Sequence, residues 1–203
     1  MSQFNHQDRT LEHIYEWQSE YLNDYDVTFY FLDIIVSDSS TYIEGNTTIN
    51  ALAVVAIDTF AFELDTVMNI HEIWINDIEY TEDFYRAENY PENVIVPINN
   101  VFEGDMISAQ VFYGGTPPSG SFFVGVDNDY SSTWEKSMTW TLSEPFAASD
   151  WFPVKQDLED KADSCWVFLT TSSDNMAGSQ GILTDVVDLG DEIRVTSGNQ
   201  IIQ

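Results

Sequence analysis

Short strand-like segments follow one another along most of this chain, and this pattern constrains its fold more than any other feature. Runs rich in β-branched and aromatic residues recur, and Asp, Asn, Gly, Pro and Ser residues separate them. Such spacing is typical of all-β proteins. The expected strands are Val27–Val36, Tyr42–Ile57 with a break near Asn50, Thr59–Leu64, Ile70–Ile75, Val94–Ile98, Met106–Tyr113, Phe122–Val126, Trp134–Leu142, Ser164–Thr170, Gly181–Val187 and Glu192–Val195. We therefore predict an all-β fold, either a sandwich or a large, curved, saddle-like mixed β-sheet.

The two ends of the chain differ from this pattern. Residues 8–23 have the apolar spacing of a helix, with Leu11, Ile14 and Leu22 on one face. The last residues, 196–203, are mostly polar and are expected to form a tail or linker. We thus predict an N-terminal helical extension (1–24), one β domain (25–195) and a tail (196–203).

The charge of the chain is strongly negative, with 35 Asp and Glu residues against 6 Lys and Arg residues and a formal net charge of −29. A surface of this sign repels phosphate backbones and anionic lipids, so nucleic acid and membrane surfaces are not expected partners. No apolar run approaches the length of a membrane-spanning helix. The acidity favours solubility in salty or cold water; attraction of cations or cationic substrates is the alternative.

Three local patterns suggest metal or thiol chemistry, and each has a structural explanation. His71-Glu72 begins like a zinc-protease motif, but Ile75 stands where the second histidine belongs, and the stretch has strand character. Asp127-Asn128-Asp129 lacks the glycine and distant glutamate of a calcium loop, so a solvated turn is expected. Cys165 is the single cysteine and lies in an apolar run, which favours a buried structural thiol. We predict no metal site and no catalytic residue in this chain.

Several of the expected strands, taken in order, carry a resemblance to a known family. Residues 25–34 read YDVTFYFLDI, residues 42–49 read YIEGNTTI, and residues 62–65 read FELD. Residues 70–77 and 111–115 follow with IHEIWIND and VFYGG. Together they resemble the N-terminal β domain of the zinc aminopeptidases, the family that includes aminopeptidase N and the leukotriene hydrolases.

The most specific part of this resemblance is the segment Glu144–Ala162. Residues 143–153 read SEPFAASDWFP, and residues 157–162 read DLEDKA. The family has there a Gln or Glu followed by Pro, then an aromatic-Phe-Pro group and a Lys-Ala pair. This sequence departs from the family pattern at Ser149-Asp150, where basic residues are usual, and at Val154, where a cysteine is usual. Gly178–Leu183 resembles the stretch that precedes the family's catalytic domain.

The resemblance implies a function that this chain performs as part of a larger protein. It would be the non-catalytic N-terminal domain of a zinc metalloaminopeptidase, inactive alone, with zinc and its ligands in a catalytic domain outside the chain. The residue matching Glu144 binds the free N-terminus of the peptide substrate in this family. The expected partners are therefore the protein's own catalytic domain and a peptide N-terminus. A buried carboxylate selects for a free ammonium, because a blocked N-terminus would leave the carboxylate unpaired.

A free-standing β-sandwich module that binds carbohydrate or another polymer is the alternative, with Trp134, Trp140 and Trp151 as an aromatic platform. Trp151, Phe152 and Pro153 are otherwise expected to fill the core or an interdomain interface, and Asp157 and Lys161 to form a helical-turn pair or an interdomain contact. The acidity and the single cysteine favour an exported bacterial protein. A cytoplasmic location is the alternative, because the family has soluble cytoplasmic members.

Overall fold

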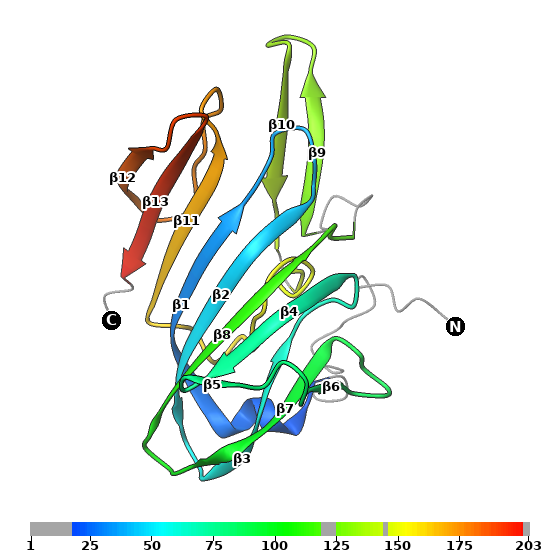
Figure 1. Cartoon of the computed structure of the whole chain (residues 1–203), viewed down its shortest axis with the longest axis vertical. Helices are drawn as coiled ribbons and strands as arrows, with labels where there is room; N and C mark the ends of the chain where they lie inside the picture. The colour runs from blue at the N-terminus through cyan, green and yellow to red at the C-terminus, as the bar shows by residue number, and fades with distance from the viewer. Residues whose placement is uncertain (1–17, 119–124, 144–145, 201–203) are drawn as a thin grey trace.

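The computed structural model describes residues 18–118, 125–143 and 146–200, and strands dominate these parts of the chain (Figure 1). An eight-stranded mixed sheet has the order β12-β13-β11-β1-β2-β8-β4-β5. Its strands are β1 (Tyr25–Ile35), β2 (Ile43–Ala53), β4 (Met68–Ile75), β5 (Ile78–Glu79), β8 (Met106–Gly115), β11 (Ser164–Ser172), β12 (Ile182–Asp188) and β13 (Glu192–Gln200). Within this sheet β1 and β11 pair in parallel, which makes the sheet mixed. The all-β prediction with a large mixed sheet is confirmed.

Two smaller sheets accompany the large one. The strands β3 (Ile57–Glu63), β7 (Asn93–Val101) and β6 (Tyr85–Arg86) form a three-stranded sheet in the order β3-β7-β6. The strands β9 (Val126–Ser131) and β10 (Lys136–Thr141) form a hairpin. The side chain of Asn128 joins this hairpin to the β1–β2 connection by donating to the carbonyl of Asp38 at 2.6 Å.

The hydrophobic core lies between the large sheet and the three-stranded sheet. In β8, the side chains of Ile107, Ala109, Val111 and Tyr113 are fully buried, and the residues between them lie on the opposite face. This period of two matches the alternation of side chains along a strand. From β3, Phe60 and Phe62 join the same core, and the ring of Phe60 lies 4.8 Å from that of Tyr25 in β1. The core therefore fixes one face of the large sheet and leaves the other open.

Several strand boundaries differ from those expected. The expected break at Asn50 is absent, and β2 runs without interruption from Ile43 to Ala53. The register shift in this strand pair lies in β1, as a bulge between Val27 and Phe29. Asp127–Asp129 was expected to be a turn and instead lies inside β9, with the turn placed at Ser132–Glu135. The expected strand Phe122–Val126 overlaps β9 only at Val126, since residues 122–124 lie outside the described residues. The last strand, β13, continues to Gln200 and takes five residues expected in the tail into the sheet.

The expected N-terminal helix lies mostly outside the described residues. The part that is described forms a short 3-10 helix, η3 (Glu20–Asp24), and the hydroxyl of Ser19 accepts a hydrogen bond from the Tyr21 N–H at 3.4 Å. In the described parts of the chain, no helix has the length and apolar character needed to cross a membrane. The division into an extension, a β domain and a tail remains a prediction.

Candidate functional site: the loop between β10 and β11

A long loop joins β10 to β11 and crosses the core face of the large sheet; we call its residues 146–160 the anchored loop. A bridge between Val154 and Glu63 attaches this loop to the end of β3. Its two backbone hydrogen bonds are 2.8 Å and 3.0 Å long, and the Asp65 N–H adds a third bond, to the carbonyl of Ser149, at 2.8 Å. The loop is therefore fixed to the domain much as a strand would be, although it has no regular structure.

Gln156 holds the first turn of the anchored loop in place. Its Oε1 atom accepts the N–H groups of Ala148 at 3.0 Å and Ser149 at 3.3 Å, and its Nε2 atom donates to the Ser149 hydroxyl at 2.9 Å. Gln156 is only 7% exposed and Ser149 is fully buried. A single buried amide thus satisfies two backbone groups of a turn that would otherwise lack partners.

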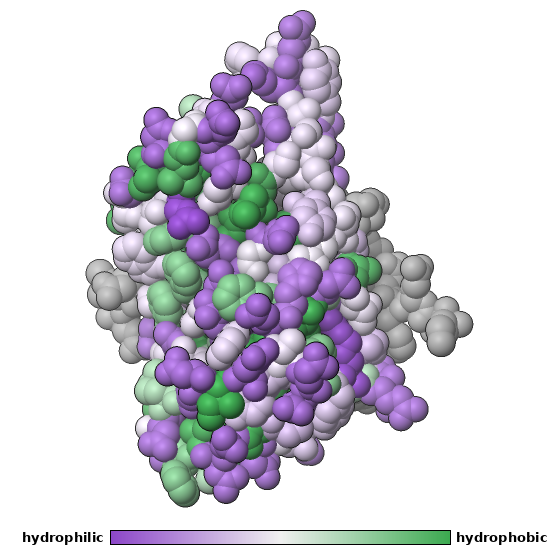
Figure 2. Space-filling model, in the orientation of Figure 1, coloured by the Kyte–Doolittle hydropathy of each residue, from purple (hydrophilic) through white to green (hydrophobic). Residues whose placement is uncertain are grey.

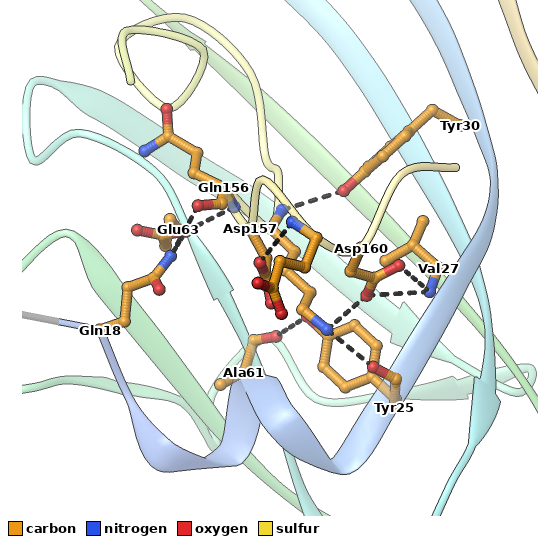
Figure 3. Close-up of polar contacts among 11 residues, drawn as sticks. Gln18, Tyr25, Val27, Tyr30, Ala61, Glu63, Gln156, Asp157 and Asp160 are labelled. Atoms are coloured by element: carbon orange, nitrogen blue, oxygen red, sulfur yellow. Dashed lines mark hydrogen bonds and ion pairs between the residues drawn. The ribbon is translucent and has the colours of Figure 1, made fainter. Parts of the chain in front are cut away.

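Glu63 fixes the same loop from the side of β3 (Figure 3). Its buried carboxylate accepts the Gln156 N–H at 2.7 Å and the side-chain amide of Gln18 at 3.2 Å. The Gln18 amide also donates to the carbonyl of Gln156 at 2.9 Å. Two donors thus converge on one carboxylate oxygen of a fully buried residue, so Glu63 is a main anchor of the loop.

Lys155 provides a second anchor through its buried ammonium group. Its Nζ atom pairs with the Asp160 carboxylate, donates to the carbonyl of Tyr25 at 2.8 Å and lies 4.9 Å from the centre of the Tyr25 ring. Asp160 in turn accepts the Val27 N–H at 3.2 Å. The ion pair therefore connects the loop to β1. Because both charges are desolvated, removal of either one would leave the other buried without a partner, which is strongly destabilising.

Two tyrosines of β1 complete this anchor. The Tyr30 hydroxyl accepts the Lys155 N–H at 2.9 Å, and the Tyr25 hydroxyl donates to the carbonyl of Ala61 at 2.7 Å. Burial raises the pKa of Tyr25 well above its ordinary value and also raises the pKa of Tyr30. Both phenols stay protonated at neutral pH, so they act as hydrogen-bonding groups and not as acids.

The residues predicted from the sequence fall in different places. Glu144 lies outside the described residues, and the described part of the loop resumes two residues after it, at Phe146. Asp157 accepts the Glu159 N–H at 2.8 Å, and the ion pair of this segment joins Lys155 to Asp160, so the structure does not show the helical-turn pair expected of Asp157 and Lys161. The other expectation for these two residues, an interdomain contact, stays a prediction. Trp151 and Phe152 pack against the core, with ring centres 4.5 Å apart, as one of the two expectations for them required.

The motifs considered for metal or thiol chemistry are strand residues. His71 lies in β4, as its sequence pattern predicts, and Asn128 of the acidic triplet donates to the Thr139 hydroxyl at 2.8 Å inside the β9–β10 hairpin. Within residues 18–118, 125–143 and 146–200, no three or more His, Cys, Asp and Glu side chains gather in a way that could hold a metal ion. The described residues therefore do not fit a zinc ion. Cys165 is half-buried, less than predicted, and burial raises the pKa of its thiol.

The aromatic platform expected for a free-standing carbohydrate- or polymer-binding module is not assembled. Trp134 is 75% exposed at the turn of the β9–β10 hairpin, and Trp140 is half-buried. Trp151 instead packs on Phe152, and its indole N–H donates to the Ser143 hydroxyl at 2.9 Å. Trp151 therefore serves the anchored loop and not an exposed platform.

The sequence did not reveal the residues that hold this loop, Glu63, Lys155 and Gln156. One signal was available, since basic residues are rare in this chain and a rare base is a candidate for a specific partner. Lys155 follows that rule, as does Arg86, whose guanidinium donates to the carbonyls of Leu64 at 2.6 Å and Pro91 at 2.8 Å.

Comparison with solved structures identifies the fold of this domain. A mutant of a two-domain M1 zinc metallopeptidase bound to L-arginine superposes with a TM-score of 0.74 at 19% identity. The M1 zinc metallopeptidase from Deinococcus radiodurans gives 0.73 at 18% identity, and its mutant bound to a Tyr-Ser-Ala substrate gives 0.70 at 17%. The fold is that of part of an M1 zinc metallopeptidase.

The similarity covers most of this chain but a smaller share of the metallopeptidase chains. It covers 86% of this chain but only 39% of the M1 metallopeptidase chains, so this chain spans well under half of their length. Comparisons with protein-family models and with curated protein sequences give no match. The resemblance read from the sequence is thus confirmed for the fold, and the match fits a domain fragment of an M1 metallopeptidase.

Proposed function

We propose that this chain is the non-catalytic N-terminal domain of a zinc metalloaminopeptidase. It covers the active site of a catalytic domain that is not part of this chain, and that domain carries the zinc ion and its ligands. The observation that carries the proposal is the similarity of 86% of the chain to 39% of an M1 metallopeptidase, at a TM-score of 0.74. The order of the sequence motifs from residue 25 to residue 195 supports the same conclusion.

Glu144 is the residue of this domain that binds the substrate's free α-ammonium group. The rigidity of the anchored loop supports this role, because Gln156 holds the N–H groups of Ala148 and Ser149, only a few residues after Glu144. Pro145 restricts Glu144 to extended backbone conformations. A rigid segment next to a binding residue reduces the ordering that binding requires, and such preorganisation favours affinity.

The first test of the proposal is the reading frame of the source gene downstream of the codon for Gln203. We expect it to continue into a Gly-x-Met-Glu-Asn segment and a His-Glu-x-x-His helix. A stop codon directly after Gln203 would overturn the proposal. The isolated chain is expected to show no turnover of aminoacyl amides, and metal-dependent turnover by the pure chain would contradict the assignment as well.

The second test uses the full-length protein. We expect Glu144→Ala to lower kcat/KM for a peptide with a free N-terminus by about thirtyfold or more, as for loss of one partner of a buried charge pair. Activity on the N-acetylated peptide should start low and change little. Glu159→Ala is the matched control, because Glu159 lies in the same loop region with an exposed side chain. Equal effects of the two substitutions would remove Glu144 from the substrate site.

A further inference from the structure

The face of the large sheet that points away from the core carries a transverse row of aromatic and amide side chains. The strand register places Trp166 beside Phe31, Phe31 beside Thr48, Thr48 beside Gln110 and Gln110 beside Trp74. We call these five residues the aromatic row. None of them is buried, although β11, β1, β2, β8 and β4 lie inside the sheet or next to its edge. In Figure 2, which shows this face, apolar and weakly polar patches alternate with hydrophilic ones.

Trp166 is held flat against the sheet at one end of the row. A Cβ atom on Gly198 of β13 would lie only 2.8 Å from Cε2, 3.0 Å from Cδ2 and 3.1 Å from Nε1 of the Trp166 indole. Only glycine leaves room for the ring at this position, so the indole lies across the β13 backbone. The residue remains 39% exposed, which leaves part of this fixed aromatic surface open to solvent.

The middle of the row offers uncharged hydrogen-bonding groups. Gln110 donates from Nε2 to Oδ1 of Asn46 at 3.0 Å, which fixes the orientation of both amides, and Thr48 adds a hydroxyl. Amide and hydroxyl groups can both donate and accept hydrogen bonds, and they carry no charge. Below this level, Asp33 is already paired with Arg194 at 3.5 Å, and the Arg194 guanidinium lies 5.8 Å from the centre of the Phe168 ring.

The charge of the molecule limits what can bind to this face. A chain with a net charge of −29 repels phosphates, sulfates and uronic acids. The row has aromatic rings at its two ends and neutral donors and acceptors between them, and the Glu72 carboxylate beside it already accepts the Trp74 indole N–H at 3.0 Å. This arrangement matches a neutral ligand that has apolar faces and hydroxyl edges. Strands lie about 4.8 Å apart, so the four steps from Trp166 to Trp74 span about 19 Å. The row therefore fits a ligand that is extended and carries no negative charge.

We propose that the aromatic row on the open face of the large sheet binds a neutral, extended, β-linked carbohydrate chain. Pyranose rings would stack on Trp166, Phe31 and Trp74, and their hydroxyls would exchange hydrogen bonds with Thr48 and Gln110. Rigid aromatic side chains supply contact area at a low entropic cost. This site goes beyond the peptidase role and lies on the opposite side of the sheet from the anchored loop.

Calorimetric titration of the chain with cellohexaose and with chitohexaose tests the proposal. We expect saturable binding of at least one, and a shift of the Trp166 indole N–H resonance, which the Trp166→Ala variant identifies. Trp166→Ala should weaken binding by about tenfold, the loss expected for one well-stacked ring. Gly198→Ala keeps the indole but displaces it, and should weaken binding as well. Gln110→Leu, which retains all three rings, gives an independent measure of the polar contacts.

Trp134→Ala is the matched control, because Trp134 is an exposed tryptophan on the β9–β10 hairpin, outside the row. It should leave the dissociation constant unchanged. The urea unfolding midpoint of each variant should equal that of the unmodified chain, which shows that the variant is folded. Absence of binding to both oligosaccharides would overturn the proposal. Loss of binding in Trp134→Ala but not in Trp166→Ala would place the site on the hairpin, and equal binding of dextran sulfate would refute the charge argument.

Discussion

The Oε2 atom of Glu63 lies 2.7 Å from the backbone nitrogen of Gln156, and both residues are buried. Glu63 ends β3, and its own backbone bridges to Val154 two residues before Gln156. Side chain and backbone of one residue therefore hold the anchored loop at two nearby positions, Gln156 and Val154. The anchored loop thus depends on a carboxylate in the three-stranded sheet, 93 positions away in the sequence from Gln156.

Removing this carboxylate should loosen the loop and destabilise the domain. We expect Glu63→Ala to lower the free energy of unfolding by about 2 kcal/mol, because it leaves the buried Gln156 N–H without its acceptor. Glu63→Gln, which keeps an acceptor oxygen, should cost less. Urea unfolding measures both, and Glu103→Ala in an exposed turn is the control. Equal stability of Glu63→Ala and Glu103→Ala would show that the contact contributes nothing.

The Lys155–Asp160 pair should behave as a coupled unit. Lys155→Met alone should lower the free energy of unfolding by about 3 kcal/mol, since it leaves the Asp160 carboxylate mostly buried without its cation. The double variant with Asp160→Asn should be more stable than the sum of the two single effects predicts, by about 1 kcal/mol or more. Lys136→Met, at an exposed position, is the control for loss of positive charge in an acidic chain. Additive single effects would contradict the coupling.

Alkaline pH should unfold the domain through its buried tyrosines. Burial raises the pKa of Tyr25, Tyr30 and Tyr113 above the ordinary value of 10.0. Above pH 10 the unfolded chain therefore releases protons that the folded chain retains, so stability is lost as the pH rises beyond that value. Below it these groups are neutral in both states and their contribution is constant.

Tyrosinate absorbance followed during an alkaline titration checks this expectation. Some of the ten tyrosines should ionise in the folded protein, and the rest should ionise only together with the loss of circular dichroism. Tyr25→Phe should reduce the second step, because burial raises the pKa of Tyr25 in the folded protein. Ionisation of all tyrosines before unfolding would contradict the assignment.

A close approach between β1 and β2 makes Gly45 irreplaceable. A Cβ atom at this position would lie 2.1 Å from the carbonyl oxygen of Asp33, a backbone atom that cannot move away without breaking the strand pairing. We expect Gly45→Ala to lower the free energy of unfolding by about 3 kcal/mol, at the upper end for overpacking. Gly178→Ala is the matched control, because a Cβ atom there meets nothing within 4 Å. Similar urea midpoints for the two variants would refute the clash.

The sequence predicted the strands well where the alternation of side chains is clear. The segment around His71 was assigned to a strand and forms β4, because β-branched residues and a following Asn-Asp turn leave little choice. β9 was missed because Asp127, Asn128 and Asp129 look like a turn in isolation. Asn128 is held in the strand by its amide contacts with Asp38 and Thr139, and no local pattern shows such contacts.

The anchored loop could be located from the sequence but not explained by it. The Glu144–Ala162 segment was identified through family resemblance, whereas Lys155, Gln156 and Glu63 appear as ordinary surface residue types. Their burial results from contacts across the fold, between residues that are 93 positions apart for Glu63 and Gln156. Propensity and periodicity describe neighbours in sequence and carry no information on such pairs.

The parallel pairing of β1 with β11 has a consequence for the synthesis of this protein. β1 leaves the ribosome before its partner β11, which follows only after β2 to β10 and the anchored loop. Until then one edge of β1 has open N–H and C=O groups that another chain could pair with. A topology with such distant pairings also folds slowly. The nascent chain thus passes through a long interval with an exposed strand edge, and we expect its yield to depend on chaperones or low temperature during expression.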